Sequence, residues 1–550
     1  MPSLIKAIAL KNFKGVSEEV RIELRPITLL FGANSTGKSS VLHALQYIRE
    51  ILDRNNANAD RTAQGGEAID LGGFMNLVHG RSDGRLIEIE IEMELGTSSI
   101  PELVPEAFED WQTQEEKVWS FYNELQMIRN KVQRASVRLA IGWNSLRAEP
   151  VVVSYEVRTN DEWCVRLEAS GDGRDTRMRL NRENPVFMVD APDADALLAE
   201  LDGWVSPLDL EYDEKLDVSS DPPTPTEVSP VVQHSVLPNL LYAVQKAGIE
   251  SPGKGMRAWL TGLNGALPRL GQMLYIPAPA AKGADNIYIA REFTAFLSWL
   301  IVGPAMLLRD QLRQLRYLGP LRRIPPRGFE VSLTKSESAW SDGMAAWETL
   351  MTASQSLVED CSEWMSGPDK LGTGYSLSRR QLQEFDLSTP EPSPVGRSKP
   401  RIALTDAAGL AHHAQDIGVG ISQVLPVVVA AQEGKASVVC IEQPELHVHP
   451  AVQVGLGDLF IDGALNKGLS FLIETHSEHL ILRLLRRIRE ATEEEGKGDG
   501  ILVTPNLVGV YYLSKEGDHT VATEIPVNGE GEFDKPWPRG FFEERGPELF

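Results

Sequence analysis

One loop of eight residues constrains this chain more than any other feature. It reads Gly32-Ala-Asn-Ser-Thr-Gly-Lys-Ser39 and lies between an apolar run that ends at Phe31 and a helical stretch that begins near Ser40. A strand, a glycine-rich loop and a helix in this order let backbone N–H groups close around phosphates at the positive end of the helix. The lysine reaches the terminal phosphates, and the serine hydroxyl is a ligand of Mg²⁺. The sequence therefore predicts a nucleotide site with contacts from Asn34, Ser35, Thr36, Gly37, Lys38, Ser39 and Ser40.

A second feature is the apolar run 438–441, which ends in Glu442, Gln443 and, two residues later, Glu445. A run of this kind is typical of a buried strand. A carboxylate at the end of such a strand can hold the water shell of a metal, and its neighbour can orient an attacking water. Apolar runs before acidic residues are common, so this pattern gains its weight from following a phosphate loop. We expect Glu442 to hold Mg²⁺ together with Ser39, partly through water.

Two polar turns complete the set. Gly420, Ser422 and Gln423 lie just upstream of the acidic strand, and a glycine-rich turn at a helix start can donate hydrogen bonds to a γ-phosphate. An ordinary helix cap explains the same residues equally well. Downstream, the apolar run 469–473 leads to Thr475 and His476, and a histidine there can contact the γ-phosphate. The alternative is a surface histidine.

In this order, the four features resemble the ABC/SMC superclass of ATPase heads, and within it the RecF-like and OLD-like AAA proteins. The segments IEQPELHVHP (441–450) and ETHSEHL (474–480) are very similar to that family, and the resemblance covers residues 1–95 and 314–550. It implies that Lys38 and Ser39 bind ATP–Mg²⁺ and that Glu442 is the Walker B metal residue. It also implies that His476 is the switch histidine and that Ser422 acts in trans. Two ATP molecules would then lie in a head-to-tail homodimer or a higher even oligomer.

Two departures from the family pattern concern the chemistry. Gln443 stands where these heads usually carry a catalytic glutamate, and glutamine can orient water but cannot accept its proton. We therefore expect slow hydrolysis unless Glu445 substitutes, and we interpret Gln443 as native because similar sequences also carry EQPE. The segment 70–79 occupies the place of the family's Q-loop region, although it contains no glutamine.

The expected fold class is α/β: an ABC/SMC-type ATPase head with a mixed sheet around the P-loop core and a long helical and β insertion. No heptad run is long enough for a coiled-coil arm. The expected parts are an N-terminal lobe (1–95), the insertion (96–313) with an acidic, proline-rich loop (185–232), a C-terminal lobe (314–526) and a tail module (527–550).

Composition narrows the class of protein. A length of 550 residues predicts more than one structural unit, and 42% apolar with 24% charged residues is ordinary for a globular protein. Cys164, Cys361 and Cys440 show no disulfide or zinc spacing, so a reducing cytoplasm is expected. The N-terminus lacks a signal-peptide layout, and the apolar run 293–308 is interrupted by Gly303-Pro304, so we expect a buried helix and no membrane contact.

A net charge of −24 restricts nucleic-acid binding to a local basic patch. The candidate patch is Arg309, Arg313, Arg316, Arg322, Arg323 and Arg327, with a salt-bridged helix stripe as the alternative. A second run, Arg483, Arg486, Arg487 and Arg489, is more typical of a solvated helix.

The expected function is an ATPase that senses and regulates in a prokaryotic antiviral defence system and controls a separate effector, which could be a nuclease. This expectation comes from a resemblance to the ATPase subunits of the Septu and PARIS systems. Residues 477–550 contain no DxD motif, so we expect no fused nuclease in this chain. The alternative is a RecF-like DNA-repair or chromosome-maintenance ATPase that binds DNA, and a transporter ATPase is a third, less favoured hypothesis.

Overall fold

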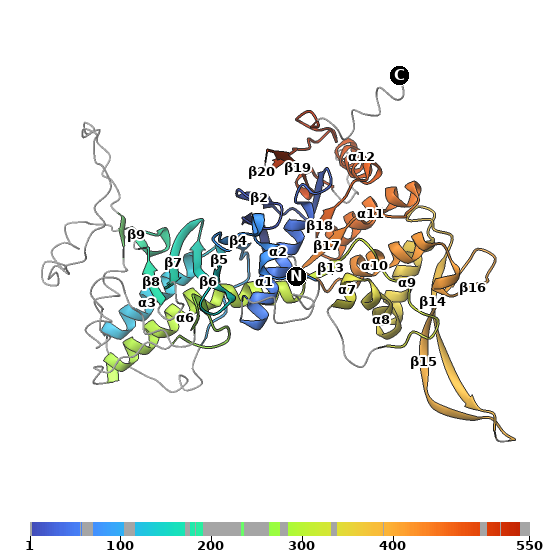
Figure 1. Cartoon of the computed structure of the whole chain (residues 1–550), viewed down its shortest axis with the longest axis horizontal. Helices are drawn as coiled ribbons and strands as arrows, with labels where there is room; N and C mark the ends of the chain where they lie inside the picture. The colour runs from blue at the N-terminus through green and yellow to red at the C-terminus, as the bar shows by residue number, and fades with distance from the viewer. Residues whose placement is uncertain are drawn as a thin grey trace, which may run out of the picture. The chain divides into compact units, whose positions relative to one another are not determined.

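The computed structural model divides the chain into two compact units (Figure 1). Unit 1 comprises Met1–Arg54, Asn58–Ile91 and Leu308–Phe550, and unit 2 comprises Asn55–Ala57 and Glu92–Leu307. The structure describes residues 3–55, 57, 70–103, 116–170, 176–181, 183–190, 233–235, 263–274, 284–331, 338–388, 390–494, 503–517 and 519–538.

Unit 1 is built on a sheet that brings together strands from both ends of the chain. The strand order is β13 (Arg316–Leu318), β17 (Val438–Glu442), β18 (Ser470–Glu474), β3 (Ile27–Gly32), β19 (Val508–Glu516) and β20 (His519–Glu524). Neighbouring strands from β13 to β19 are parallel, and β20 is antiparallel to β19. Since parallel strands end at the same edge, the residues after β3, β17 and β18 meet there.

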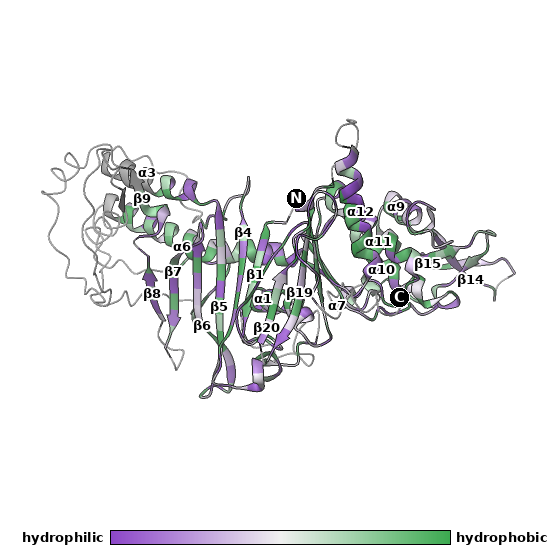
Figure 2. Cartoon of the chain, turned by 90° about the horizontal axis from the view of Figure 1, so that it is seen from above, coloured by the Kyte–Doolittle hydropathy of each residue, from purple (hydrophilic) through white to green (hydrophobic). Residues whose placement is uncertain are grey.

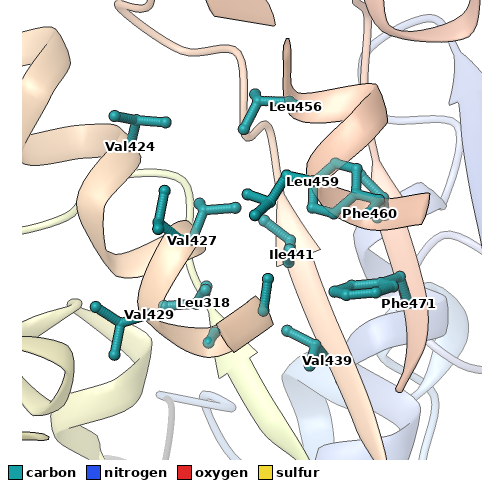
Figure 3. Packing of buried hydrophobic residues seen from close by; sticks show 14 of the residues in the cluster. Leu318, Val424, Val427, Val429, Val439, Ile441, Leu456, Leu459, Phe460 and Phe471 are labelled. Carbon is teal, nitrogen blue, oxygen red and sulfur yellow. The ribbon is translucent and has the colours of Figure 1, made fainter. Parts of the chain in front are cut away.

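The strands of this sheet are nearly continuous apolar runs because helices cover them. The covering helices are α1 (Lys38–Arg54), α10 (Val419–Glu433), α11 (Pro450–Asn466) and α12 (Glu478–Glu494). Figure 3 shows Val427 of α10 and Leu459 of α11 close to Ile441 of β17, and Phe460 beside Phe471. The amphipathic α12 carries both hydrophilic and hydrophobic residues (Figure 2), and Leu480, Ile481, Leu484 and Ile488 are buried.

The rest of unit 1 consists of small elements and one long hairpin. Strands β1 (Ile5–Lys11) and β2 (Val20–Glu23) pair in antiparallel fashion, and α2 (Phe74–Leu77) is a single turn. Helices α7 (Ser338–Ser341), α8 (Met344–Thr352) and α9 (Gln355–Ser366) precede β14 (Ser376–Asp386), β15 (Ser393–Thr405) and β16 (Ala411–His412). The β14–β15 hairpin extends beyond α8 and α9 (Figure 1).

Unit 2 contains an antiparallel meander and helices. After β4 (Ile87–Glu94), in which the chain leaves unit 1, come α3 (Glu116–Lys131), β5 (Arg134–Asn144), β6 (Glu149–Thr159), β7 (Glu162–Ala169) and β8 (Thr176–Leu180). Strands β5 to β8 pair in sequence order. Two short pairs follow, β9 (Met188–Asp190) with β10 (Gln233–Ser235) and β11 (Leu263–Asn264) with β12 (Leu267–Pro268).

Helix α6 (Ala284–Arg313) contains the interrupted apolar run. Its segment Ile287–Arg313 is long and apolar enough to cross a membrane, yet 83% of the apolar window is buried inside the protein. Phe293, Phe296 and Leu300 are fully buried. The prediction of a buried helix is therefore confirmed, since core helices of globular proteins share this composition.

Two expectations about irregular segments need comment. The predicted loop 185–232 is wrong for residues 185–190, which form a 3-10 turn and β9 because the Asn184 side chain caps Val186 N–H and Phe187 is buried. Residues 191–232 lie outside the described residues. Of the expected tail module, residues 539–550 also lie outside them, whereas Trp537 packs edge-on against Phe31 with ring centroids 5.3 Å apart.

Candidate nucleotide-binding site

The loop between β3 and α1 has the backbone that its glycines predict. Gly32 has φ +139° and Gly37 has φ +102°, and Ser35 also lies at positive φ, +64°. A Cβ atom at Gly32 would come within 2.1 Å of the Leu513 carbonyl oxygen of β19, so only glycine fits there. Successive residues at positive and negative φ curl the backbone into a concave nest of N–H groups, which is an anion-binding geometry.

Lys38 lies inside this loop. Its ammonium group donates to the carbonyls of Gly32 (3.0 Å) and Ala33 (2.8 Å), and the residue is only 3% exposed. Burial lowers the pKa of Lys38, although Glu474 opposes the shift. The carbonyl oxygens of the loop therefore surround the Lys38 ammonium. Phosphate oxygens of a bound nucleotide would replace these carbonyls as the partners of the lysine.

Two carboxylates stand side by side at the edge of the sheet where β17 and β18 end. Glu442 and Glu474 are register partners on these neighbouring strands. Ser39 donates its hydroxyl to Glu474 at 2.6 Å, and the Lys38 ammonium lies 3.8 Å from the other oxygen of Glu474. The sequence analysis did not identify Glu474 as a site residue, because the expected contact with the γ-phosphate was assigned to His476, two residues later. The available signal was an acidic residue at the end of a second apolar strand.

Glu442 is engaged on its other side. The Tyr317 hydroxyl donates to Glu442 Oε1 at 2.7 Å, and His43 Nε2 lies 3.1 Å from the same oxygen. Burial alone would raise the pKa of Glu442, but the bonds from His43 and Tyr317 outweigh it and the pKa falls below its usual value. Lys14 contacts His43 Nδ1, and burial lowers the pKa of Lys14 to about 8. Glu442 is thus a negative charge held by its own small network.

Both carboxylate oxygens of Glu445 are occupied by hydrogen bonds, so Glu445 is not a free base. It accepts hydrogen bonds from the Thr475 hydroxyl (2.8 Å) and the His476 backbone N–H (2.7 Å). Burial raises the pKa of Glu445, and burial also lowers the pKa of His476, with the Lys38 charge adding to the effect. Gln443 adopts φ +45° and donates its N–H to the Glu474 carbonyl at 2.8 Å. The acidic strand end and the histidine turn are therefore tied together.

The expectation for Ser422 needs correction. Its side chain is fully buried, and its hydroxyl donates to the Ala414 carbonyl at 3.4 Å, so it cannot reach a partner's nucleotide in this conformation. The physical reason is that α10 is buried on all sides from Ser422 to Gln432, so only its first residues, such as Gly418 and Val419, are exposed. Gly420 lies against the 443–448 loop, since a Cβ there would be 2.6 Å from the His447 carbonyl oxygen. Gln423 is buried and pairs with the Arg322 backbone.

The predicted basic patch is wrong for Arg322, which is 3% exposed. Its guanidinium donates to the Glu442 carbonyl at 2.8 Å, and burial lowers its pKa to about 10. The other five arginines each have an acidic neighbour, as the salt-bridged alternative predicts. The pairs are Arg309–Asp310 (3.1 Å), Arg313–Asp53 (2.6 Å), Arg316–Glu433 (3.9 Å), Arg323–Asp342 (3.2 Å) and Arg327–Asp416 (2.5 Å).

In the second run, Arg483 and Arg487 share Asp458 of α11, while Arg486 pairs with Glu490. Arg483 and Arg487 thus join α12 to α11, whereas Arg486 is an exposed side chain paired within α12, so the expected solvated helix describes only part of this run.

The segment 70–79 borders the phosphate loop although it lacks the expected glutamine. Lys14 N–H bonds the Leu77 carbonyl at 2.6 Å, and His79 Nδ1 lies 2.9 Å from the Lys14 carbonyl. A pocket of about 640 Å³ opens here, lined by Lys14, Leu71, Asn76, Val78, Gly80 and Arg81. The Q-loop assignment of this segment stays a prediction.

The donor set fits Mg²⁺ bound with a nucleotide. Among the described residues, no group of three or more His, Cys, Asp or Glu side chains is placed to hold a metal ion by itself. Mg²⁺ in nucleotide sites takes one or two protein ligands and completes its shell with phosphate oxygens and water. Ser39 beside a strand-end carboxylate, at the mouth of a loop whose glycines admit no side chain, provides that partial set.

Comparisons with known proteins agree with this chemistry. Residues 4–136 match the family model described as "AAA ATPase domain", and residues 348–483 match "AAA domain, putative AbiEii toxin, Type IV TA system". No curated protein matches the sequence.

The chain is also similar to solved SMC heads. One is bound to the C-winged helix domain of ScpA (12% identity, 95% of this chain and 97% of that chain, TM-score 0.37). A head derived from Pyrococcus furiosus gives 12% identity, coverage of 96% and 97%, and a TM-score of 0.38; one from Thermotoga maritima gives 9%, 96% and 100%, and 0.34. Likenesses this low carry no information about ligands or partners. The strand order and the two family matches confirm the α/β fold with its P-loop core, and both lobes of the chain contain sequence that matches AAA-type ATPase domains.

Proposed function

We propose that this protein binds ATP–Mg²⁺ and hydrolyses it slowly, and that it works as a homodimeric sensor and regulator. The observation that carries the proposal is the convergence of Lys38, Ser39 and two strand-end carboxylates on a loop that only glycines can form. Residues from three separate segments meet there, although nothing in local structure requires it. Core packing alone would place apolar side chains at this edge.

Each residue has a definable part. Bound ATP–Mg²⁺ supplies the phosphoanhydride bond and a cation that neutralises developing charge. Lys38 exchanges the Gly32 and Ala33 carbonyls for phosphate oxygens, and Ser39 provides a hydroxyl ligand. His476 is neutral near pH 7, since its pKa is lowered, so it can accept or donate one hydrogen bond at the terminal phosphate.

The slow turnover follows from how the acids are placed. Gln443 cannot take a proton from water. Glu445 could, but its two carboxylate oxygens already accept bonds from Thr475 and His476. The protein would therefore hold ATP for long periods, which suits a switch better than a motor.

We further propose that two copies associate head to tail, or in a higher even-numbered oligomer, around the nucleotides. The part of the protein that would face the partner's ATP is the exposed backbone at Gly418 and Val419, at the start of α10. A helix N-terminus of this kind favours an anion, and α10 has no side-chain cap that would compete. Ser422 supports this helix from inside.

The biological setting we propose is antiviral defence in the prokaryotic cytoplasm. The match of residues 348–483 to an AbiEii-type AAA model supports it. In that setting the ATP state would control a separate effector, such as a nuclease. Nucleic acid could be the trigger. The alternative of a RecF-like repair ATPase requires an unpaired basic face, and the arginines proposed for it are buried or paired.

Light scattering with and without ATP–Mg²⁺, alongside phosphate release, tests the proposal on the full-length protein. We expect ATP to increase the molar mass to an even-numbered oligomer while turnover stays slow. Val419→Arg should abolish assembly but keep ATP binding, because it places a bulky cation at the exposed helix start. Lys435→Ala, at an exposed position after the same helix, is the matched control. If Lys38→Ala and Ser39→Ala both still bind ATP as the wild type does, the proposed site is refuted.

A further inference from the structure

The two carboxylates at the end of β17 and β18 are not equivalent, although both are nearly buried. Glu442 is 7% exposed and Glu474 is 6% exposed. Each therefore depends on its hydrogen-bond partners to remain charged. The hydrogen-bond partners of Glu442 differ from those of Glu474, and this difference indicates different roles for the two residues.

Glu442 is bound by side chains that lie outside the phosphate loop. Both Tyr317 of β13 and His43 of α1 use the same oxygen, Oε1, at 2.7 and 3.1 Å. Arg322 adds a bond to the backbone carbonyl of Glu442 at 2.8 Å. The carboxylate is thus held by two side chains and the backbone by a third, so Glu442 is positioned firmly, but one of its carboxylate oxygens is already occupied.

Glu474 is bound on the side of the phosphate loop. Its Oε2 accepts from the Ser39 hydroxyl at 2.6 Å, and its Oε1 lies 3.8 Å from the Lys38 ammonium. These are the two residues whose side chains serve nucleotide and metal in a P-loop. Glu474 therefore has its short contacts with the nucleotide-binding machinery itself.

We propose that Glu474 is the carboxylate that holds Mg²⁺ together with Ser39, directly or through a metal-bound water, and that Glu442 is a positioning residue fixed by Tyr317 and His43. This inference rests on the proposed ATP–Mg²⁺ site and specifies its metal residue. It reassigns the role that the sequence pattern gives to Glu442.

The charge balance at the edge of the sheet supports the assignment. Glu442, Glu445 and Glu474 all interact electrostatically with the Lys38 ammonium, while Lys14 also lies near Glu442 and Arg322 near Glu442 and Glu445. Burial raises the pKa of Glu474, and the nearby Glu442 and Glu445 add to the shift. A divalent cation at Glu474 would offset the repulsion among these carboxylates, whereas Glu442 also lies near the cationic side chains of Lys14 and Arg322.

The test measures metal binding rather than turnover. Mn²⁺ is titrated by electron paramagnetic resonance into the full-length protein with a non-hydrolysable ATP analogue, for the wild type, Glu474→Gln, Glu442→Gln and the exposed control Glu363→Gln. We expect Glu474→Gln to weaken Mn²⁺ binding by more than about 100-fold, and Glu442→Gln by about 10-fold, because changes to groups that only orient a metal ligand cost roughly 10- to 100-fold. Glu363 is a surface side chain that pairs with Lys370, so its variant should match the wild type.

A second measurement separates this inference from the proposed function. Binding of a fluorescent ATP analogue in EDTA should be as tight or tighter in Glu474→Gln, since a negative charge beside the phosphates is gone. If wild-type protein binds no nucleotide at all, the proposed function fails. If nucleotide binds normally but Glu442→Gln loses the Mn²⁺ signal while Glu474→Gln keeps it, the reassignment is wrong and β17 supplies the metal residue. If Glu474→Gln does not fold, Glu474→Asp replaces it, since this variant keeps the charge on a side chain that is one methylene shorter. Glu474→Asp should still weaken Mn²⁺ binding more than Glu442→Gln does.

Discussion

The hydroxyl of Thr475 should contribute more to stability than its size suggests. Thr475 is fully buried; its hydroxyl donates to Glu445 at 2.8 Å and accepts from Ser477 N–H at 3.0 Å. Thr475→Val keeps the shape and removes both bonds. A hydrogen bond to a charged group is worth about 1.5–3 kcal/mol, and a buried N–H left without a partner costs about 1–3 kcal/mol. We therefore expect a loss of roughly 3–5 kcal/mol, which combines these two contributions.

Thr475→Ser is the matched control because it keeps the hydroxyl and removes one methyl group, a change of about 0.8 kcal/mol on burial grounds. Both variants are compared with the wild type by urea unfolding at pH 7, where the midpoint reports stability at constant slope. Equal midpoints for the valine and serine variants would refute the reasoning, since they would show that the hydroxyl bonds contribute nothing.

The contribution of the hydrogen bond between Thr475 and Glu445 to stability should depend on pH. Burial raises the pKa of Glu445, so the ionised carboxylate is the form that needs the Thr475 hydroxyl. As pH falls through the raised pKa, Glu445 takes up a proton and the charge-assisted bond is lost in wild type as well. The stability deficit of Thr475→Val should therefore shrink toward acid pH.

Four further predictions concern the site and its supports. Gln443→Glu should raise ATP turnover by at least about tenfold, because a general base typically contributes 10²- to 10⁴-fold; phosphate release measures it, and no increase would mean that the missing base does not limit the rate. Glu445→Gln should lower turnover, and unchanged turnover would remove Glu445 from the mechanism. Gly32→Ala should destabilise the protein by roughly 2–5 kcal/mol through its clash with the Leu513 carbonyl and its positive φ, as thermal unfolding would show. Asp458→Asn should cost about 1–3 kcal/mol at pH 7, because Asp458 accepts bonds from Arg483 and Arg487. Burial would raise the pKa of Asp458, but these bonds lower it overall, so its contribution is present above pH ~4 and is lost as pH falls through the depressed value; a mutant deficit that persists at low pH would contradict this.

The sequence predicted the parts of the site that are contiguous in the chain. Lys38 and Ser39 follow from a motif whose geometry is local, and the glycines at 32 and 37 have the positive φ that the motif needs. The apolar runs also identified β17 and β18 correctly as buried strands. These predictions depend only on short-range order, which a single sequence contains.

What the sequence did not predict depends on the rotation of helices and on partners from distant segments. The family resemblance implied that Ser422 acts in trans, but α10 is buried from Ser422 onward, and only the packing of this helix within the fold determines that. Arg322 was included in the candidate basic patch because it follows other arginines in the sequence, yet it lies after β13 and is buried, bonded to Gln423 and to the Glu442 carbonyl. The pairing of Ser39 with Glu474 joins residues at opposite ends of the chain, and no local pattern reveals it.

The place of β3 between β18 and β19 has a consequence for how this protein is made. The phosphate loop is synthesised near the start, but the strands on both sides of its strand leave the ribosome near the end. At about 5–20 residues per second, the loop waits on the order of a minute before its neighbours exist. During that time the apolar segment of β3 has neither of its neighbouring strands, so we expect the nascent chain to need protection by a chaperone. A product that stops before β17 would contain the phosphate-loop motif but neither Glu442 nor Glu474.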